Sequence, residues 1–153
     1  MSTLFAIDLG LKSGLAVYGA DGRLRRYRST NFGSRSNLRS AVWNLLKDAE
    51  PTFVVMEGDK DLGAIWSRAA QRMGVEVISV APRTWREVIL LPRERRSGQD
   101  AKAAADGAAR AIIEWSGAPK PTSLRHDAAE AILIGLWGVY EVGWIDEFPH
   151  VLG

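Results

Sequence analysis

Short apolar runs and amphipathic stretches alternate along the chain in an order that predicts its secondary structure. Apolar runs of strand length occur at 3–9, 15–18 and 53–57, and 75–80 alternates less regularly. The hairpin-turn residues Gly19-Ala20-Asp21-Gly22 predict a further strand at 24–28. Apolar residues recur at helical spacing in 37–49, 61–73, 84–91, 101–115 and 124–142. Asp61 is expected to cap the start of the helix at 61–73, and Gly74 its end.

The order of these elements predicts the fold class. Three strands come first as an antiparallel meander, and two βα units follow. An α/β fold with a five-stranded mixed sheet and helices on both faces is the arrangement that this order favours. Neither an internal repeat nor a linker divides the chain, so residues 1–153 are expected to form a single domain.

Composition narrows the function classes. The 153 residues are 46% hydrophobic and 25% charged, which is typical of a globular protein. Without cysteine the chain can form neither a disulfide nor a thiolate metal site. No apolar run approaches the roughly 20 residues of a membrane helix, and the first residues carry no basic region or cleavage signal. A cytoplasmic location without membrane contact is therefore expected.

Basic residues cluster in two segments. Residues 21–39 contain six arginines against one acid, and residues 83–96 contain five arginines against two acids. Arginine binds phosphate oxygens in a planar, bidentate manner, so both segments could hold a nucleic-acid backbone, although solvated strand and loop faces are the alternative. Trp85, flanked by Arg83 and Arg86, could stack on a base or brace the arginines.

Four acidic residues stand where an ionised side chain is costly. Asp8 ends the first strand and Glu57 the fourth, and Asp127 and Glu130 share one face near the start of the last helix. Burial disfavours an ionised carboxylate unless it is paired or binds a cation. Each acid also has an ordinary explanation, in a turn or in the first turn of a helix. If the segments converge, the four acids form a divalent-metal site.

Such a site would suit hydrolysis of a phosphodiester. Carboxylate oxygens without thiols are the ligands that Mg²⁺ and Mn²⁺ prefer. Two ions about 4 Å apart can activate water and neutralise the leaving oxygen. Asp8, on the central strand, is expected to bridge both ions. Glu57 would bind one ion, and Asp127 with Glu130 the other, because residues three apart on a helix face the same way.

The order of elements and acids resembles the ribonuclease H-like superfamily and, within it, the RuvC-type Holliday junction resolvases. Ala6-Ile7-Asp8-Leu9-Gly10 resembles the first motif of that family, Val54-Val55-Met56-Glu57 the second, and His126-Asp127-Ala128-Ala129-Glu130-Ala131 the third. Val80-Ala81-Pro82-Arg83-Thr84-Trp85 and Asp100-Ala101-Lys102 are similar to a RuvC stretch beside the active site. Leu9 and Glu130 depart from the pattern, which often has Pro and usually Asp at these places.

The resemblance implies a Mg²⁺- or Mn²⁺-dependent, structure-selective endonuclease that uses two ions. It would resolve four-way Holliday junctions in branched DNA during recombination and repair, as a homodimer. The implied metal-binding and catalytic residues are Asp8, Glu57, Asp127 and Glu130, with Lys102 as a contact to phosphate or the transition state. The expected nucleic-acid contacts are Lys12, Arg83, Trp85, Arg86, Arg93, Arg95, Arg96 and Lys102.

Other functions remain open on the same residues. A fold of this kind could carry a YqgF-like nuclease acting on RNA, or a non-catalytic nucleic-acid-binding module. Residues 8–14 could also be the phosphate turn of an actin-like ATPase or sugar kinase, although those proteins need two such domains. His126 could position a water or contact a phosphate. Dimer contacts are expected from the helix at 61–73 or from Trp137 and Trp144.

Overall fold

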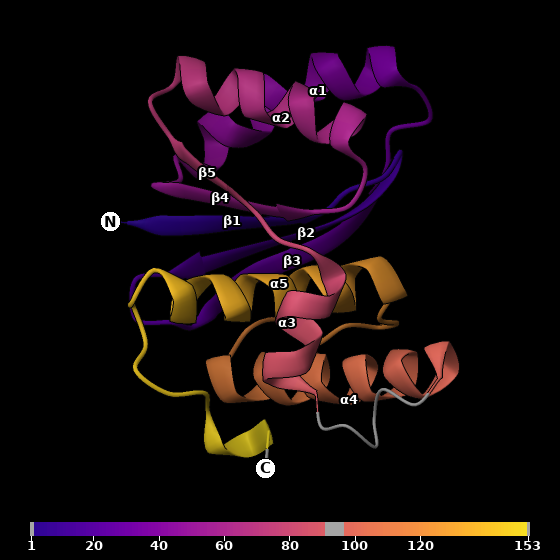
Figure 1. The fold of residues 1–153 in the computed structure, drawn as a ribbon, viewed down its shortest axis with the longest axis vertical. Helices are drawn as coiled ribbons and strands as arrows, with labels where there is room; N and C mark the ends of the chain where they lie inside the picture. The colour runs from indigo at the N-terminus through magenta and orange to yellow at the C-terminus, as the bar shows by residue number, and fades with distance from the viewer. Residues whose placement is uncertain (1, 91–96, 153) are drawn as a thin grey trace.

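A five-stranded mixed sheet with helices on both faces forms the molecule (Figure 1). The computed structural model describes residues 2–90 and 97–152. The elements are β1 (Thr3–Asp8), β2 (Lys12–Gly19), β3 (Leu24–Asn31), α1 (Arg35–Ala49), β4 (Phe53–Glu57), α2 (Lys60–Arg72), β5 (Glu76–Ser79), α3 (Pro82–Ile89), α4 (Gly98–Ser116), α5 (His126–Glu141) and η2 (His150–Leu152). The predicted α/β class and its order of strands and helices are confirmed.

Strand β1 lies at the centre of the sheet, whose order is β3-β2-β1-β4-β5. It pairs antiparallel with β2 and parallel with β4, while β3 extends the antiparallel side and β5 the parallel side. The predicted meander and the two βα units are therefore both present. Because β1 and β4 stay in register to their last residues, Asp8 lies directly opposite Glu57.

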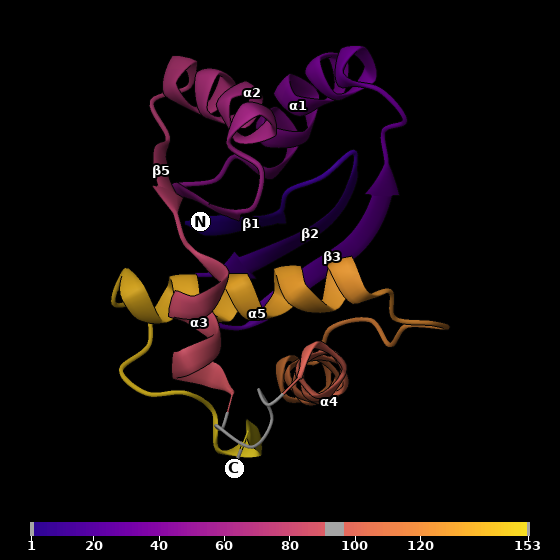
Figure 2. The ribbon, with the colours of Figure 1, turned by 45° about the vertical axis from the view of Figure 1, so that its right-hand side comes forward.

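Alternation of side chains along the strands divides the core into two layers. Phe5 and Ile7 pack on the side covered by α1 and α2, whereas Leu4 and Ala6 pack on the side covered by α4 and α5. Figure 2 shows the two helical layers on opposite sides of the sheet. Asp8 continues the alternation of Leu4 and Ala6, so its carboxylate projects toward α5.

Helix α5 packs closely on the sheet because glycines line the contact. It is buried from Ala128 to Val139. A Cβ on Gly14 of β2 would lie 1.8 Å from the backbone oxygen of Asp127, so only glycine permits this approach. The buried hydroxyl of Tyr18 donates to the carbonyl of Ile132. The Gly14 contact holds the start of α5 against the end of the sheet that carries Asp8, and the Tyr18 bond holds the helix farther along.

Element boundaries depart from the predicted ones for local reasons. The residue that caps α2 is Asp59, not Asp61, because the Asp59 carboxylate accepts hydrogen bonds from the amides of Asp61 and Leu62 at 2.7 and 3.0 Å. Helix α3 begins at Pro82, two residues earlier than predicted, because proline suits a first turn whose amides need no partner. Ser97 caps α4, whose start is thereby moved to Gly98.

None of the helices in the described part of the chain has the length and apolar character that a membrane span requires. Three of the arginines predicted to contact nucleic acid, Arg93, Arg95 and Arg96, lie outside the described residues.

Candidate metal centre

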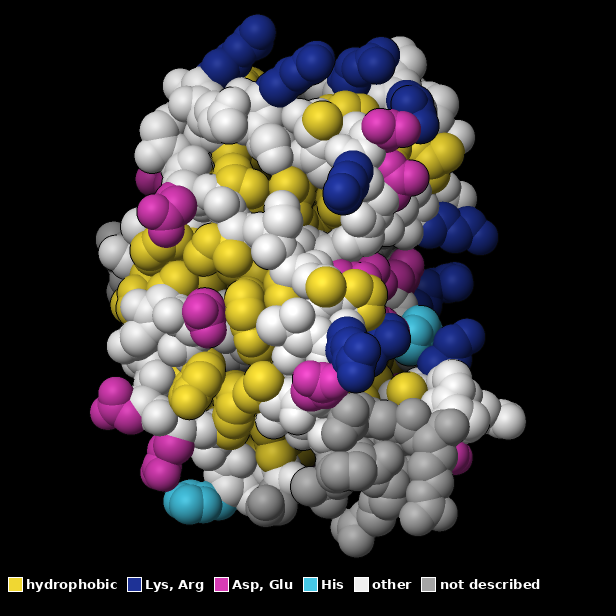
Figure 3. Space-filling view, in the orientation of Figure 1, with side chains coloured by type: hydrophobic (Ala, Val, Ile, Leu, Met, Phe, Trp, Pro, Cys, Tyr) yellow, Lys and Arg dark blue, Asp and Glu magenta, His cyan; other side chains and the backbone are white. Residues whose placement is uncertain are grey.

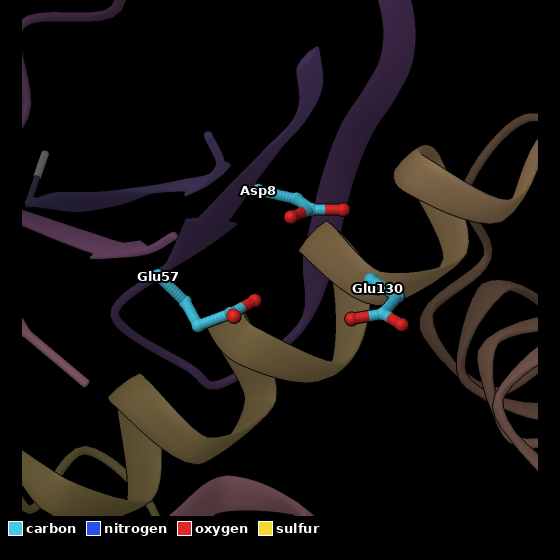
Figure 4. A group of neighbouring side chains, drawn as sticks. All are labelled: Asp8, Glu57 and Glu130. Atoms are coloured by element: carbon cyan, nitrogen blue, oxygen red, sulfur yellow. The ribbon is translucent and has the colours of Figure 1, made fainter. Parts of the chain in front are cut away.

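Three carboxylates from β1, β4 and α5 converge at one end of the sheet. Asp8, Glu57 and Glu130 each present an oxygen, and these oxygens lie within 4.8 Å of one another (Figure 4). The strand register places Asp8 beside Glu57, and α5, which begins at His126, brings Glu130 to them just after its first turn. Glu57 is 7% exposed and Glu130 5%, so two of the three charges are almost withdrawn from water.

The crowding of these acids makes their ionised forms unfavourable. Burial, together with the smaller effects of the negative charges of Glu130, Glu57 and Asp127, raises the pKa of Asp8 from its ordinary value of 3.8 to about 8, although Arg86 opposes the rise. Burial, together with the charge of Glu130, also raises the pKa of Glu57. A cation bound among the carboxylates would relieve this repulsion.

Two basic side chains contact the buried carboxylate of Glu130. Arg86 on α3 donates to its two oxygens at 3.0 and 3.3 Å. Nε2 of His126 lies 2.7 Å from Oε1 of the same carboxylate. The sequence predicted that Arg86 contacts nucleic acid, but it gave no sign of this partner. A metal ion at Glu130 would therefore compete with Arg86 and His126 for the same oxygens.

Asp127 lies beside the three acids, but its carboxylate has other partners. Oδ1 of Asp127 accepts hydrogen bonds from the hydroxyl of Ser29 on β3 and from the amide of Ala128. Its charge still contributes to the raised pKa of Asp8. The structure thus brings together three of the four predicted acids, and the fourth stays outside the group. Ser29 is 98 residues away from Asp127 and belongs to no motif, so nothing in the sequence marked it as a partner.

The prediction that Trp85 stacks on a base is wrong. Its side chain is 0% exposed and belongs to the core between the sheet, α4 and α5, so no ring face is available to a nucleotide. The other suggested role fits the structure, because Cζ of Arg86 lies 5.2 Å from the centroid of the Trp85 ring. Trp85 therefore supports the arginine that contacts Glu130.

The remaining predicted contacts are exposed cations. Lys12 begins β2 at the end of the sheet that carries Asp8. Arg83 on α3 pairs with Glu87 at 2.7 Å. Lys102 is exposed on α4, and within residues 2–90 and 97–152 no hydrogen bond or ion pair joins it to the acidic group. Its assignment to the transition state stays a prediction.

The surroundings of the acidic group are open and partly basic. A cavity of about 730 Å³ adjoins Glu57, between the start of α2 and the connection from β5 to α3. Figure 3 shows Lys and Arg side chains gathered along one edge of this face, together with a His and several acidic side chains. A polyanion could therefore approach acids that would otherwise repel it.

Comparisons with known proteins bear on the fold. No protein-family model matches the chain, and no curated protein sequence matches it. The Fowlpox virus Holliday junction resolvase is similar in structure, with a TM-score of 0.72 at 16% identity, covering 92% of this chain and 99% of that one. RuvC from T. thermophilus, in complex with a Holliday junction substrate, has a TM-score of 0.63 at 18% identity, covering 94% of this chain and 96% of that one.

The yeast mitochondrial Holliday junction resolvase gives a TM-score of 0.50 at 15% identity, covering 94% of this chain and 82% of that one. Identities this low show the fold and leave the activity to be argued from the site. The chain has the ribonuclease H-like fold of the RuvC-type resolvases, as the sequence motifs implied.

Proposed function

We propose that this protein is a divalent-metal-dependent endonuclease that hydrolyses phosphodiesters of branched DNA and resolves four-way junctions. The observation that carries the proposal is the convergence of Asp8, Glu57 and Glu130 at the end of the central strands. Support for the substrate comes from the fold, since T. thermophilus RuvC and the Fowlpox virus resolvase are both known in complex with Holliday junctions.

The donor set fits Mg²⁺ or Mn²⁺. All three converging side chains offer hard oxygen ligands, and the chain has no cysteine to favour a softer metal. Asp8, Glu57 and Glu130 would hold the first ion. Asp127, whose charge already acts on Asp8, is our candidate for holding a second.

When bound, the ions would polarise the phosphoryl group and help to deprotonate the attacking water. The protein's own contribution is to hold its ligands in place. Asp8 and Glu57 are fixed by the paired ends of two central strands, and Glu130 by a helix that packs directly on Gly14. Preorganised ligands of this kind need little rearrangement when charge develops on the phosphate.

Basic residues around the acids would hold the DNA. Arg86, at the rim of the acidic group, presents a planar guanidinium that can bind phosphate oxygens once a metal ion takes its place on Glu130. Lys12, Arg83 and Lys102 are exposed cations that we assign to the DNA backbone. A homodimer completes the proposal, because a four-way junction has approximate two-fold symmetry and requires two symmetric cuts.

A cleavage panel tests the proposal. The substrates are a synthetic four-way junction, a linear duplex of the same sequence and a structured RNA, each with Mg²⁺, Mn²⁺ or EDTA. We expect metal-dependent cleavage of the junction, and a loss of at least about a hundredfold in Asp8→Asn with junction binding retained. Asp106→Asn is the matched control, since Asp106 lies on exposed α4 surface and pairs with Arg110.

Other outcomes select the alternatives. Cleavage of RNA but not of the junction would favour a YqgF-like nuclease. An absence of cleavage, together with calorimetry that detects no Asp8-dependent binding of Mn²⁺, would favour a non-catalytic binding module. Asp8→Asn protein that still cuts the junction would contradict the assignment of the acidic site.

A further inference from the structure

A basic groove lies next to the candidate metal centre, between the edge strand β3 and the connection from α4 to α5. It encloses about 370 Å³. Its charged lining residues are Arg26, Arg28, Lys120 and Arg125, and neither Asp nor Glu is among the residues that line it. Both segments that form the groove belong to the described part of the chain.

The two walls of the groove are tied together. The hydroxyl of Tyr27, in the middle of β3, donates to the carbonyl of Pro119 in the connection between the helices. The backbone amide of Leu24 donates to the hydroxyl of Ser116 at 3.0 Å, which holds the end of α4 against the same strand. The groove is therefore formed by the fold itself and does not depend on a ligand to assemble it.

The positive charge of these walls is largely uncompensated. Residues 24–31 and 119–125 together contain five Arg or Lys residues and no Asp or Glu. Arg26 lies 3.7 Å from Asp48 across the edge of the sheet. Arg28, Lys120 and Arg125 are exposed, and the described residues offer no ion-pair partner to any of them. Three free cations along one groove are complementary to a chain of phosphates.

One end of the groove reaches the proposed active site. Ser29 lines it and also donates its hydroxyl to Asp127. Ala128, the next residue along α5, lines it as well. A strand lying in the groove would therefore lead directly to the acids at the end of the sheet.

We propose that this groove binds the phosphate backbone of the DNA strand on the β3 side of the metal centre. Arg28, Lys120 and Arg125 are the main contacts, and Arg26 is a weaker one because it is shared with Asp48. The groove is separate from the arginines of residues 83–96. The assignment of a DNA strand to it rests on the proposed function. Only backbone phosphates are recognised, so binding here is independent of base sequence.

A simpler role exists for two of these residues. Arginines on an edge strand can prevent its unpaired backbone from pairing with another molecule. That role accounts for Arg26 and Arg28, but Lys120 and Arg125 lie off the strand and protect no edge. The experiment must therefore measure self-association as well as DNA binding.

The test compares two variants that each lose one lysine and two arginines. The groove variant is Arg28→Gln/Lys120→Gln/Arg125→Gln. The control is Lys47→Gln/Arg68→Gln/Arg72→Gln, whose residues are exposed on α1 and α2 across the sheet. Affinity for a fluorescent four-way junction and for a linear duplex is measured in EDTA, where a metal-dependent enzyme cannot cut, over a range of salt concentrations. Sedimentation gives the oligomeric state of each protein.

We expect the groove variant to bind the junction at least about tenfold more weakly than the control near 0.1 M salt. The slope of log affinity against log salt should fall by about 3, close to one for each lost phosphate contact. In the wild-type protein, bound junction should also protect Lys120, but not Lys47, from acetylation. Equal affinity and slope in the two variants would overturn the proposal, as would self-association of the groove variant with its DNA affinity intact.

Failure of the groove and failure of the proposed function give different results. If the groove variant binds like the control while wild-type protein cuts the junction with Mg²⁺, the groove assignment is wrong and the nuclease assignment stands. If wild-type protein cuts no branched DNA but the groove variant loses DNA affinity, the nuclease assignment is wrong and the groove assignment stands.

Discussion

Replacement of Asp8 by Asn should stabilise the metal-free protein, although it removes a proposed metal ligand. Burial and the neighbouring acids raise the pKa of Asp8 from 3.8 to about 8 in the folded protein. Between these two values the folded state keeps a proton that the unfolded chain gives up. The favourable contribution of protonated Asp8 is therefore complete below about pH 4, and it is lost as the pH rises to about 8.

The size of the effect follows from the shift. A difference of about four pKa units corresponds to roughly 6 kcal/mol at about 1.4 kcal/mol each. Because titration is incomplete at both ends of the range, about 5 kcal/mol of this is lost from the free energy of unfolding between pH 4 and pH 8. Asn keeps the shape of the side chain without the charge. Asp8→Asn should therefore be the more stable protein at pH 8 in EDTA, and its advantage should shrink steadily toward pH 4.

Urea unfolding at several pH values in EDTA, followed by tryptophan fluorescence, measures this difference. Asp106→Asn serves as the control, because Asp106 is exposed and pairs with Arg110. Mn²⁺ should then raise the stability of the wild-type protein at pH 8 and leave Asp8→Asn nearly unchanged, since only a folded site with its ligands binds the ion. A wild-type protein whose stability is flat between pH 5 and pH 8, or an Asp8→Asn protein that is less stable at pH 8, would show that Asp8 is not protonated in the folded state.

Three further substitutions test the supports of the site. Gly14→Ala should lower the free energy of unfolding by about 1–3 kcal/mol and slow junction cleavage, because its Cβ would overlap the backbone of Asp127. A variant that matches the wild type in urea unfolding and in cleavage would contradict this. Arg86→Gln should lower the free energy of unfolding by about 1–3 kcal/mol at pH 8 in EDTA, because the buried Glu130 loses its guanidinium partner. A loss that saturating Mn²⁺ does not reduce would contradict metal binding at Glu130. Tyr18→Phe should cost about 1 kcal/mol in urea unfolding through its lost hydrogen bond to α5, and no measurable cost would show that this bond does not hold the helix.

The positions of Asp8 and Glu57 at the ends of strands could be predicted from the sequence, because they follow from the local pattern of apolar residues. Apolar runs that stop at Asp8 and Glu57 predict carboxylates at the ends of strands, and the order of elements predicts that those strands are neighbours. The structure confirms both, and adds a register in which the two residues are paired. The register between β1 and β4 depends on how the intervening β2, β3 and α1 pack, so the sequence alone could not supply it.

The helical part of the site was only half predictable. Spacing of three residues put Asp127 and Glu130 on one face of α5, which suggested a shared ion. In the structure the start of α5 lies over Gly14, so Asp127 reaches Ser29 on β3 while Glu130, almost one turn later, reaches the acids of β1 and β4. The two acids thus have different partners because of where α5 lies on the sheet.

The partners of Glu130 could not be predicted either. Arg86 reaches it only because α3 crosses α5, and the two residues are 44 apart in the chain. Trp85 was misassigned for a related reason. A tryptophan between two arginines is compatible with an exposed stacking surface, but the amphipathic pattern of α3 is too short to show which side faces the core.

Anomalous diffraction from a crystal of the wild-type protein soaked in Mn²⁺ would locate an ion bound by the three converging acids. We expect an anomalous peak bound by the carboxylates of Asp8, Glu57 and Glu130, with one or both of the hydrogen bonds from Arg86 to Glu130 lost. No peak at this place, with Arg86 still holding both oxygens of Glu130 at saturating Mn²⁺, would contradict it.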